Sequence, residues 1–449
     1  MNRAVQVIVV VMTLFLATLF QCEERRVSAQ GRSRQAAKPA RQTWAQWRGP
    51  MRNGLVGGPV WPERLSAEHL ELVWKAPAGL SYSGPIVSET MVFVTETKEK
   101  TTEIVHAFDR ATGKELWKAE WPGAISVPFF AKKNGDWIRS TPAYDGKSLF
   151  VAGMRDMLVS LDAKTGREQW RVDFVKELNA PVPEFGFVCS PLVDGEFVYV
   201  QAGNAVVKLN KATGKVIWQS LRNPDGIMTA GAFSSPVIAE LAGRRQLVVQ
   251  TREKLAGISL ETGEVLWLQP VPNFRGMNIL TPVIYGDTIF TSSYQNKSWL
   301  YRVAREGERF TVQQVWENTA QGYMSTPVVI DGYAYLHLAN QRIACIDLRT
   351  GERTWTTTQR FGKYWSMVAQ GDRILALDEE GKLLLLKANP KAFELIDERP
   401  VSDPEAWAHL ALCDDQVFIR DLNTLHVYRW RTAKPAPAVS GGAAQTRLR

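Results

Sequence analysis

The 449-residue sequence has few of the residues that build metal and redox sites. It contains four cysteines and five histidines, and none of them occurs at the spacing of a zinc site or a CxxC pair. Cys189, Cys345 and Cys413 lie in apolar, strand-like runs, which is typical of small buried side chains. The sequence therefore predicts no metal site and no disulfide framework.

Catalytic signature motifs are missing as well. The sequence contains no GxSxG, no HExxH, no phosphate-binding loop and no dinucleotide fingerprint. A Ser/His/Asp set assembled by the fold stays open, but no residue is predicted to be catalytic.

Long apolar runs are absent except at the N-terminus. Arg3 precedes an apolar run from Val5 to Phe20, and small residues at Val27 and Ala29 then precede Gln30. This layout is typical of a secretory signal peptide, and the run is shorter than the ~20 residues that span a bilayer. Residues 1–29 are therefore predicted to be a signal peptide, with a retained anchor or lipidation at Cys22 as alternatives.

The net charge of +8 is concentrated in the two ends of the chain. Residues 1–29 carry three Arg and two Glu, residues 30–43 carry four basic residues, and residues 431–449 carry four more. Without these three segments, the net charge of residues 44–430 is about −1. A nucleic-acid partner is therefore not expected. The two Ala/Pro/Gly-rich segments 30–43 and 431–449 are predicted to be disordered, and could hold the protein at a membrane.

One phrase recurs along the chain: an apolar stretch, Asp or Asn, two residues, Thr-Gly, three residues and Trp. Its clearest copies end at Trp117, Trp170 and Trp218, and degraded copies end at Trp267 and Trp355. A second phrase, a small residue before Pro and then alternating apolar residues, precedes it. Successive prolines from Pro85 to Pro327 are 57, 49, 45, 46 and 45 residues apart, the period of propeller blades.

Two further units without Pro begin near Trp365 and Trp407, which brings the number of units to eight. The predicted fold is all-β: an eight-bladed β-propeller of four-stranded antiparallel blades. The last unit lacks a fourth strand, and the strand-like segment 72–75 before the first unit can supply it and close the ring. The predicted organisation is a signal peptide 1–29, a basic linker 30–43, a lead-in 44–71, the propeller 72–430 and a tail 431–449.

The Trp of each unit is predicted to lie on the outermost strand and to pack against the neighbouring blade. Asp and Thr cap the tight turn before it, and Gly allows the positive φ that the turn needs. The predicted docking residues are Trp74, Trp117, Trp170, Trp218, Trp267, Trp316 and Trp355.

These repeats resemble the pyrroloquinoline-quinone-like propeller family, and among its members the chain is most similar to the envelope proteins grouped with BamB, the outer-membrane assembly propeller. The copy Ala107 to Trp117 matches the family phrase throughout, and the lead-in WAQWRGPMRNG resembles that of many exported members. The resemblance also extends to quinone-dependent dehydrogenases of the same fold, but their adjacent cysteines and calcium-binding segment are not found in this sequence. No cofactor is therefore predicted; pyrroloquinoline quinone with calcium is the alternative.

The channel mouth is the predicted binding site, because the residues before each innermost strand converge there. The candidates are Tyr82, Trp137, Arg139, Phe187, Phe233, Asn278, Tyr323, Trp365, Trp407 and His409. Packing of the channel entrance explains these residues equally well, so both interpretations stay open. We expect a non-catalytic, exported scaffold, in the periplasm or at the cell surface, that binds an envelope protein or polysaccharide. The alternative is a quinoprotein-like oxidoreductase or a carbohydrate-binding propeller.

Overall fold

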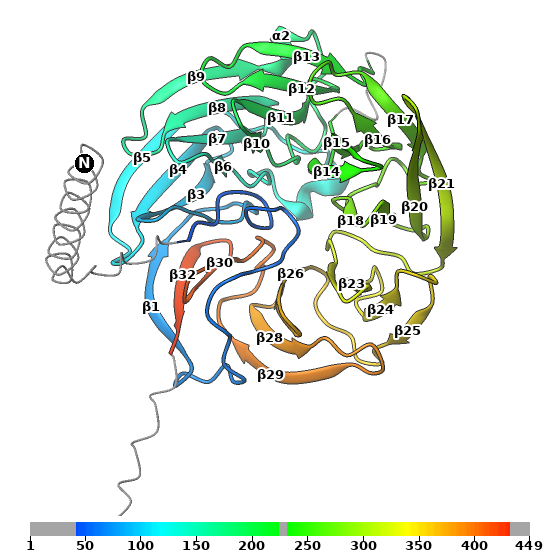
Figure 1. Ribbon diagram of the computed structural model, residues 1–449. Helices are drawn as coiled ribbons and strands as arrows, with labels where there is room; N and C mark the ends of the chain where they lie inside the picture. Colours follow the sequence, from blue (N-terminus) through cyan, green and yellow to red (C-terminus); the bar gives the residue numbers. More distant parts are fainter. Residues whose placement is uncertain (1–41, 224–230, 432–449) are drawn as a thin grey trace, which may run out of the picture. The chain divides into compact units, whose positions relative to one another are not determined.

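The computed structural model describes residues 42–223 and 231–431. Within these ranges, 32 strands pair into eight four-stranded antiparallel sheets arranged around a common axis (Figure 1). The predicted eight-bladed β-propeller is confirmed. The predicted signal peptide, the tail after Arg431 and the linker before Gln42 lie outside the described residues, and the domain boundaries stay predictions.

Blades 1 to 7 take their strands in chain order from the axis outward. Blades 1 to 4 consist of β2 (Ile86–Val87), β3 (Met91–Lys98), β4 (Thr102–Asp109), β5 (Glu115–Pro122); β6 (Ala143–Tyr144), β7 (Ser148–Gly153), β8 (Met157–Asp162), β9 (Glu168–Asp173); β10 (Leu192–Asp194), β11 (Phe197–Ala202), β12 (Ala205–Asn210), β13 (Val216–Ser220); β14 (Val237–Leu241), β15 (Arg244–Gln250), β16 (Lys254–Ile258) and β17 (Val265–Pro270). Blades 5 to 7 consist of β18 (Val283–Tyr285), β19 (Thr288–Ser292), β20 (Ser298–Glu306), β21 (Arg309–Asn318); β22 (Val328–Ile330), β23 (Tyr333–His337), β24 (Ile343–Asp347), β25 (Arg353–Thr356); β26 (Trp365–Gln370), β27 (Arg373–Asp378), β28 (Lys382–Lys387) and β29 (Glu394–Pro400).

Blade 8 is built from both ends of the propeller sequence. Its inner strands are β30 (Ala411–Cys413), β31 (Gln416–Arg420) and β32 (Thr424–Trp430), and β1 (Leu70–Pro77) pairs antiparallel with β32 as the fourth strand. This confirms the predicted closure by an N-terminal strand. No sheet edge is left open at the junction.

Helix is limited to two short turns in the described part of the chain. A 3-10 helix (η1, Phe129–Asn134) follows blade 1, and one α-helical turn (α2, Phe174–Glu177) follows blade 2. Among the described residues, neither helix has the length and apolar character needed to cross a bilayer.

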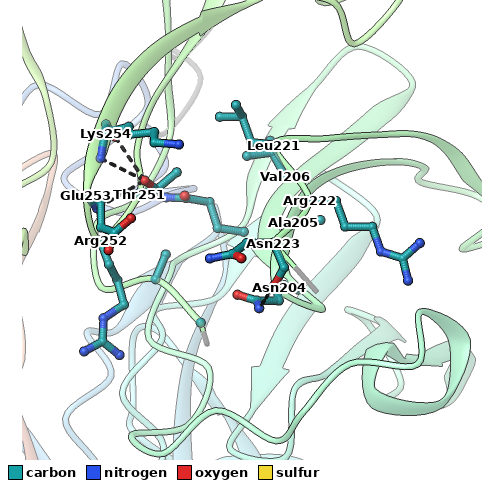
Figure 2. A pocket seen from close by; sticks show the side chains of 14 residues that line it. Asn204, Ala205, Val206, Leu221, Arg222, Asn223, Thr251, Arg252, Glu253 and Lys254 are labelled. Atoms are coloured by element: carbon teal, nitrogen blue, oxygen red, sulfur yellow. Dashed lines mark hydrogen bonds between the residues drawn. The ribbon is translucent and has the colours of Figure 1, made fainter. Parts of the chain in front are cut away.

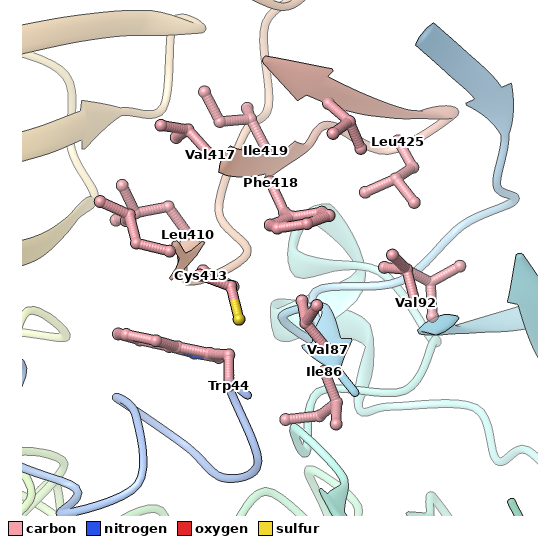
Figure 3. Packing of buried hydrophobic residues seen from close by; sticks show 14 of the residues in the cluster. Trp44, Ile86, Val87, Val92, Leu410, Cys413, Val417, Phe418, Ile419 and Leu425 are labelled. Carbon is pink, nitrogen blue, oxygen red and sulfur yellow. The ribbon is translucent and has the colours of Figure 1, made fainter. Parts of the chain in front are cut away.

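The seam between blades 8 and 1 is held by apolar packing and by buried arginines, among them Arg110. Side chains of β2, β3 and β31, together with Trp44, form a continuous core across the seam (Figure 3). Arg110, in the Asp-x-x-Thr-Gly turn of blade 1, donates to Gln416 Oε1 at 2.7 Å, to the Cys413 carbonyl at 3.0 Å and to the Asp414 carboxylate at 2.9 Å. Its side chain is 2% exposed, so this polar clamp is shielded from solvent. Cys189, Cys345 and Cys413 are all buried and free.

The repeated Trp lies on the fourth strand and hydrogen-bonds to the next blade in six of the seven predicted positions. The indole N–H donates to a backbone carbonyl of the following blade's outer turn, with the pairs Trp74–Arg110, Trp117–Ala163, Trp170–Lys211, Trp218–Leu260, Trp316–Leu348 and Trp355–Asn389 at 2.8–3.3 Å. Trp267 differs, since it donates to Gln246 Oε1 of its own blade at 2.6 Å. Blade 5 joins β20 to β21 through a Glu-Gly-Glu hairpin instead of the Asp-x-x-Thr-Gly turn, so it does not present the usual acceptor.

The glycine of the Thr-Gly pair provides the surface on which this Trp rests. A Cβ on Gly214 would lie 2.7 Å from the Trp170 ring, and Gly214 also has φ +72°. Both the turn and the close approach of the indole therefore require glycine at this position.

The Ser or Thr before the repeated proline of blades 2, 3, 4 and 6 connects that blade to the preceding one near the axis. Gly84 N donates to Thr141 Oγ1, Thr141 N to Ser190 Oγ, and Ser190 N to Ser235 Oγ, each at 2.9–3.0 Å. Blades 5 and 6 repeat this bond between Thr281 N and Thr326 Oγ1 at 3.1 Å. These hydroxyls satisfy backbone donors that the short inner strands leave unpaired.

Candidate functional site: an aromatic cavity on the propeller axis

The segment 42–56, which we call the strap, lies across one end of the channel and hydrogen-bonds to all eight blades (Figure 1). Its partners, in blade order, are Val87, Tyr144, Val193, Pro236, Thr281, Pro327, Ala369 and Asp414. The WRGPMRNG part of the predicted lead-in therefore belongs to the propeller and closes this end of the channel.

Two arginines of the strap are buried without a carboxylate partner. Arg52 donates to the carbonyls of Pro236 and Pro191 at 2.8 Å and of Ser190 at 3.1 Å. Arg48 donates to the Pro327 carbonyl at 2.6 Å. Burial lowers the pKa of Arg48 to about 9 and that of Arg52 to about 10, and both stay cationic at neutral pH.

Glycine is required where the strap turns beneath Arg48. Gly54 has φ +76°, and a Cβ there would lie 2.8 Å from an Arg48 guanidinium nitrogen. The arginine can cross the backbone because this position carries no side chain.

Above the strap lies a cavity of about 200 Å³ on the channel axis. Trp47 of the strap and His409 of blade 8 both line it, and their rings meet edge to face at 4.8 Å. The other lining residues are Tyr82, Asn134, Arg139, Phe185, Val188, Ser190, Phe233, Ser235, Met277, Ile279, Thr281, Tyr323, Met324, Thr326, Tyr364, Trp365, Ser366 and Trp407. The cavity is thus mainly aromatic and aliphatic, with hydroxyl groups between.

A simple register relates this lining to the repeat. In blades 1 to 6 the third residue before the repeated proline lines the cavity, and in blades 3 to 6 the first residue before it does so too. Tyr364 and Ser366 take these places in blade 7, and Trp407 and His409 take them in blade 8. The extended backbone alternates its side chains, which brings these two positions to the axis. Trp365 in blade 7 and Tyr323 in blade 6 line the cavity as well, so alternation alone does not decide the lining.

Aromatic rings form a continuous arc along the cavity. Tyr82 stacks on Trp407 at 4.2 Å, and Trp407 packs against Tyr364 at 3.9 Å. Tyr364 in turn stacks on Tyr323 at 5.7 Å, and Trp137 meets Tyr82 edge to face at 5.4 Å. The arc presents flat apolar faces to any ligand in the cavity.

Arg139 is the one cationic side chain in this lining. Its guanidinium lies over the Tyr82 ring at 5.7 Å and donates to the Gly135 carbonyl at 2.6 Å. Burial lowers the pKa of Arg139, opposed by Tyr82 and Asp136. Among the described residues, its Nε and the Trp407 indole nitrogen have no hydrogen-bond partner.

The lining histidine is held neutral. Burial and the nearby Arg48 charge lower the pKa of His409 to about 3. Its Nδ1 lies 2.8 Å from the Leu410 carbonyl, which fixes Nδ1 as the donor in the neutral ring. Burial also raises the pKa of the Tyr82 and Tyr364 hydroxyls, so the walls carry no negative charge at neutral pH.

Seven of the ten predicted mouth residues line the cavity: Tyr82, Arg139, Phe233, Tyr323, Trp365, Trp407 and His409. Trp137 lies behind Tyr82. Phe187 and Asn278 do not line it, which corrects their placement at the mouth. Phe187 packs on Phe174 within the blade core, and Asn278 donates to the Arg252 carbonyl at 3.0 Å. Each is held by these contacts within its own blade or connection instead. A binding role for the ten stays a prediction.

The sequence prediction missed several lining residues. Val188, Ile279 and Met324 are signalled by the third-residue register, which could be read from the aligned repeats. Trp47 could not be found in this way, because nothing in the lead-in indicates that it returns to the axis.

A second cavity of about 350 Å³ lies between blades 3 and 4 (Figure 2). Asn204, Arg222, Asn223 and residues 251–254 line it, and Thr251 turns back to accept from Lys254 N at 3.0 Å. It adjoins residues 224–230, which lie outside the described ranges, so no site is assigned to it.

The cavity on the axis does not suit a calcium-bound quinone. Such a group needs carboxylate and amide ligands, whereas the lining offers one amide, Asn134, and no carboxylate. Across residues 42–223 and 231–431, no cluster of three or more His, Cys, Asp or Glu side chains could hold a metal ion.

The fold and the repeats define this protein as an eight-bladed propeller of the pyrroloquinoline-quinone-like class. The family described as outer membrane protein assembly factor BamB matches residues 101–357, and the chain belongs to this family.

Individual relatives are distant. BamB of Yersinia pestis is 25% identical over 262 residues, which cover 55% of this chain and 63% of that protein. BamB of Moranella endobia is 21% identical over 305 residues, which cover 68% and 64%. The chain thus spans less than two thirds of the length of these relatives. The crystal structure of BamB from Moraxella catarrhalis aligns with a TM-score of 0.59 at 12% identity, over 82% of this chain and 99% of that one, and supports the fold alone.

Proposed function

We propose that this protein is a non-catalytic, exported propeller that binds a protein or polysaccharide of the cell envelope. The observation that carries the proposal is membership of the assembly-factor family over residues 101–357. The predicted signal peptide agrees with export. The role of the relatives is transferred here as a proposal, because they are matched over only part of their length.

The chemistry of the cavity supports a binding role over a catalytic one. General acid-base catalysis needs a group whose pKa lies near the working pH. His409 has a pKa of about 3, and the tyrosines have raised pKa values. The lining therefore offers no group poised to exchange a proton at neutral pH.

The experiment is capture of the partner from envelope extracts of the cells that make this protein. The full chain, tagged at its C-terminus, is expressed in those cells, crosslinked and purified after detergent extraction. We expect stoichiometric recovery of an envelope protein or polysaccharide that is absent when an unrelated exported protein is tagged in the same way. Recovery of the chain alone, under conditions that retain known envelope complexes, would contradict the scaffold.

The oxidoreductase alternative has its own measurement. The purified chain is mixed with pyrroloquinoline quinone and calcium and followed by calorimetry and absorption. We expect no tight uptake, since the lining supplies no carboxylate ligand. Stoichiometric uptake with a quinone spectrum would contradict the proposed non-catalytic scaffold and support the oxidoreductase.

A further inference from the structure

Three arginines lie in or beneath the channel cavity, whereas no carboxylate lines it. Arg48 and Arg52 lie beneath it and bond only to carbonyl groups, and Arg139 stands in its wall. No Asp or Glu is among the lining residues. Acidic groups act from outside the lining: Asp136 on Arg139, Asp378 as the acceptor of the Trp365 indole at 2.8 Å, and Glu379 and Glu405 on the tyrosines.

Two residues of the cavity wall keep a donor without a partner. The Nε of Arg139 and the indole N–H of Trp407 have no partner among the described residues. The other polar side chains of the wall are hydroxyls, the Asn134 amide and neutral His409. A carboxylate presents acceptors alone and can take bonds from the arginine, the indole and the hydroxyls together.

The remaining wall is apolar and flat. Trp407, Tyr364, Trp365 and Phe233 contribute aromatic rings, and Met324 adds an adaptable thioether. The volume of about 200 Å³ is enough for one small ring, since a cavity of about 150 Å³ holds benzene.

We propose that this cavity is a binding site for a small organic anion, in which one carboxylate meets Arg139 and the Trp407 indole while a flat apolar body lies against the aromatic arc. The strap forms the closed end of the site through Trp47. The site is independent of the envelope partner proposed above, because it needs only the folded chain.

The test is calorimetric titration of the full chain with three probes that share a phenylpropanoyl skeleton. 3-Phenylpropionate represents a free acid, N-acetyl-L-phenylalanine represents the carboxyl end of a polypeptide, and 3-phenylpropanamide lacks the charge. We expect saturable 1:1 binding of at least one carboxylate and at least about tenfold weaker binding of the amide, because a charged hydrogen bond is lost. Preference for the first probe would indicate a metabolite, and preference for the second a chain end.

Variants locate the site. Arg139→Gln should weaken carboxylate binding at least about tenfold, Arg139→Lys less, and Trp407→Phe by about three- to tenfold, since it keeps the ring and removes the N–H donor. Lys132→Gln is the matched control, because this exposed cation on the same connection does not line the cavity, and it should bind as the parent does. Unchanged melting temperatures would show that the variants are folded.

The proposal fails if neither carboxylate saturates the protein by about 10 mM. A complex with a millimolar Kd, about 4 kcal/mol, would already be saturated at that concentration. It also fails if the amide binds as tightly as the acids, or if folded Arg139→Gln binds unchanged. Failure to capture an envelope partner would leave these titrations unaffected, so the two proposals are judged separately.

Discussion

Removing Arg52 tests whether the strap is part of the propeller's stability. The Arg52 side chain is 4% exposed and donates three hydrogen bonds, to carbonyls of blades 3 and 4. Arg52→Ala would leave these carbonyls unpaired and would empty the space beneath the channel cavity.

The size of the effect follows from two opposing contributions. A hydrogen bond from a charged group contributes about 1.5–3 kcal/mol, so three of them contribute about 4.5–9 kcal/mol. Burial lowers the pKa of Arg52 from 12.5 to about 10, which corresponds to a desolvation cost of about 3 kcal/mol that the variant no longer bears. We therefore expect Arg52→Ala to lower the free energy of unfolding by about 2–5 kcal/mol.

The assay is urea denaturation followed by tryptophan fluorescence, with Arg52→Lys and Arg360→Ala as companions. Lysine keeps the charge but not the three-way geometry, and should fall between the parent and alanine. Arg360 is exposed, and its loss should change the free energy by less than about 0.5 kcal/mol. If Arg52→Ala proves as mild as Arg360→Ala, the strap is a loosely held segment and the closed end of the cavity is wrongly described.

Three further measurements probe the ring. In urea denaturation, Gly214→Ala should lower the free energy of unfolding by about 1–3 kcal/mol more than Gly195→Ala does. Both residues have positive φ, but only a Cβ on Gly214 would press onto Trp170. Equal costs would exclude the packing role of Gly214. Arg110→Ala should lower the free energy of unfolding by about 3–5 kcal/mol, because it opens the clamp between blades 1 and 8. Arg171→Ala removes the half-exposed Arg171–Glu168 pair within blade 2 and should lower it by at most about 1 kcal/mol. Similar costs for Arg110→Ala and Arg171→Ala would refute the clamp. Burial raises the pKa of Asp156 to about 7, so the native state holds a proton that the unfolded state releases near pH 4, and this group's contribution to stability falls between about pH 4 and 7. Asp156→Asn should therefore raise the melting temperature relative to the parent increasingly from pH 4 to pH 8, and a constant difference would refute the assignment.

The blade number and the closure could be predicted because they depend on repeated local rules. Proline spacing gives the period, and a last unit of three strands requires a fourth from elsewhere in the chain. Trp267 shows where such rules stop. Its phrase matches the repeat, but its usual acceptor belongs to the next unit, and that unit has replaced its turn.

The candidate site was predicted less completely for two physical reasons. Phe187 and Asn278 were placed at the mouth from their residue type, but Phe187 packs on Phe174 within its blade and Asn278 bonds to the Arg252 carbonyl. Arg48, Arg52 and Trp47 contact residues more than a hundred positions away. No local pattern in the lead-in encodes contacts at that distance.

The reach of the strap has a consequence for the order in which the protein is made. Gln42 donates to Asp414, 372 positions further along the chain, and β1 waits for β32 in the same way. While the polypeptide is emerging, the strap has only part of its partners and β1 has none, and an unfinished ring exposes strand edges at both ends. Such long-range pairing is slow and vulnerable to aggregation. The cavity is completed only when the eighth blade joins the ring, so a chain with fewer blades lacks part of its wall, and occupancy of the cavity would report that all eight blades had folded.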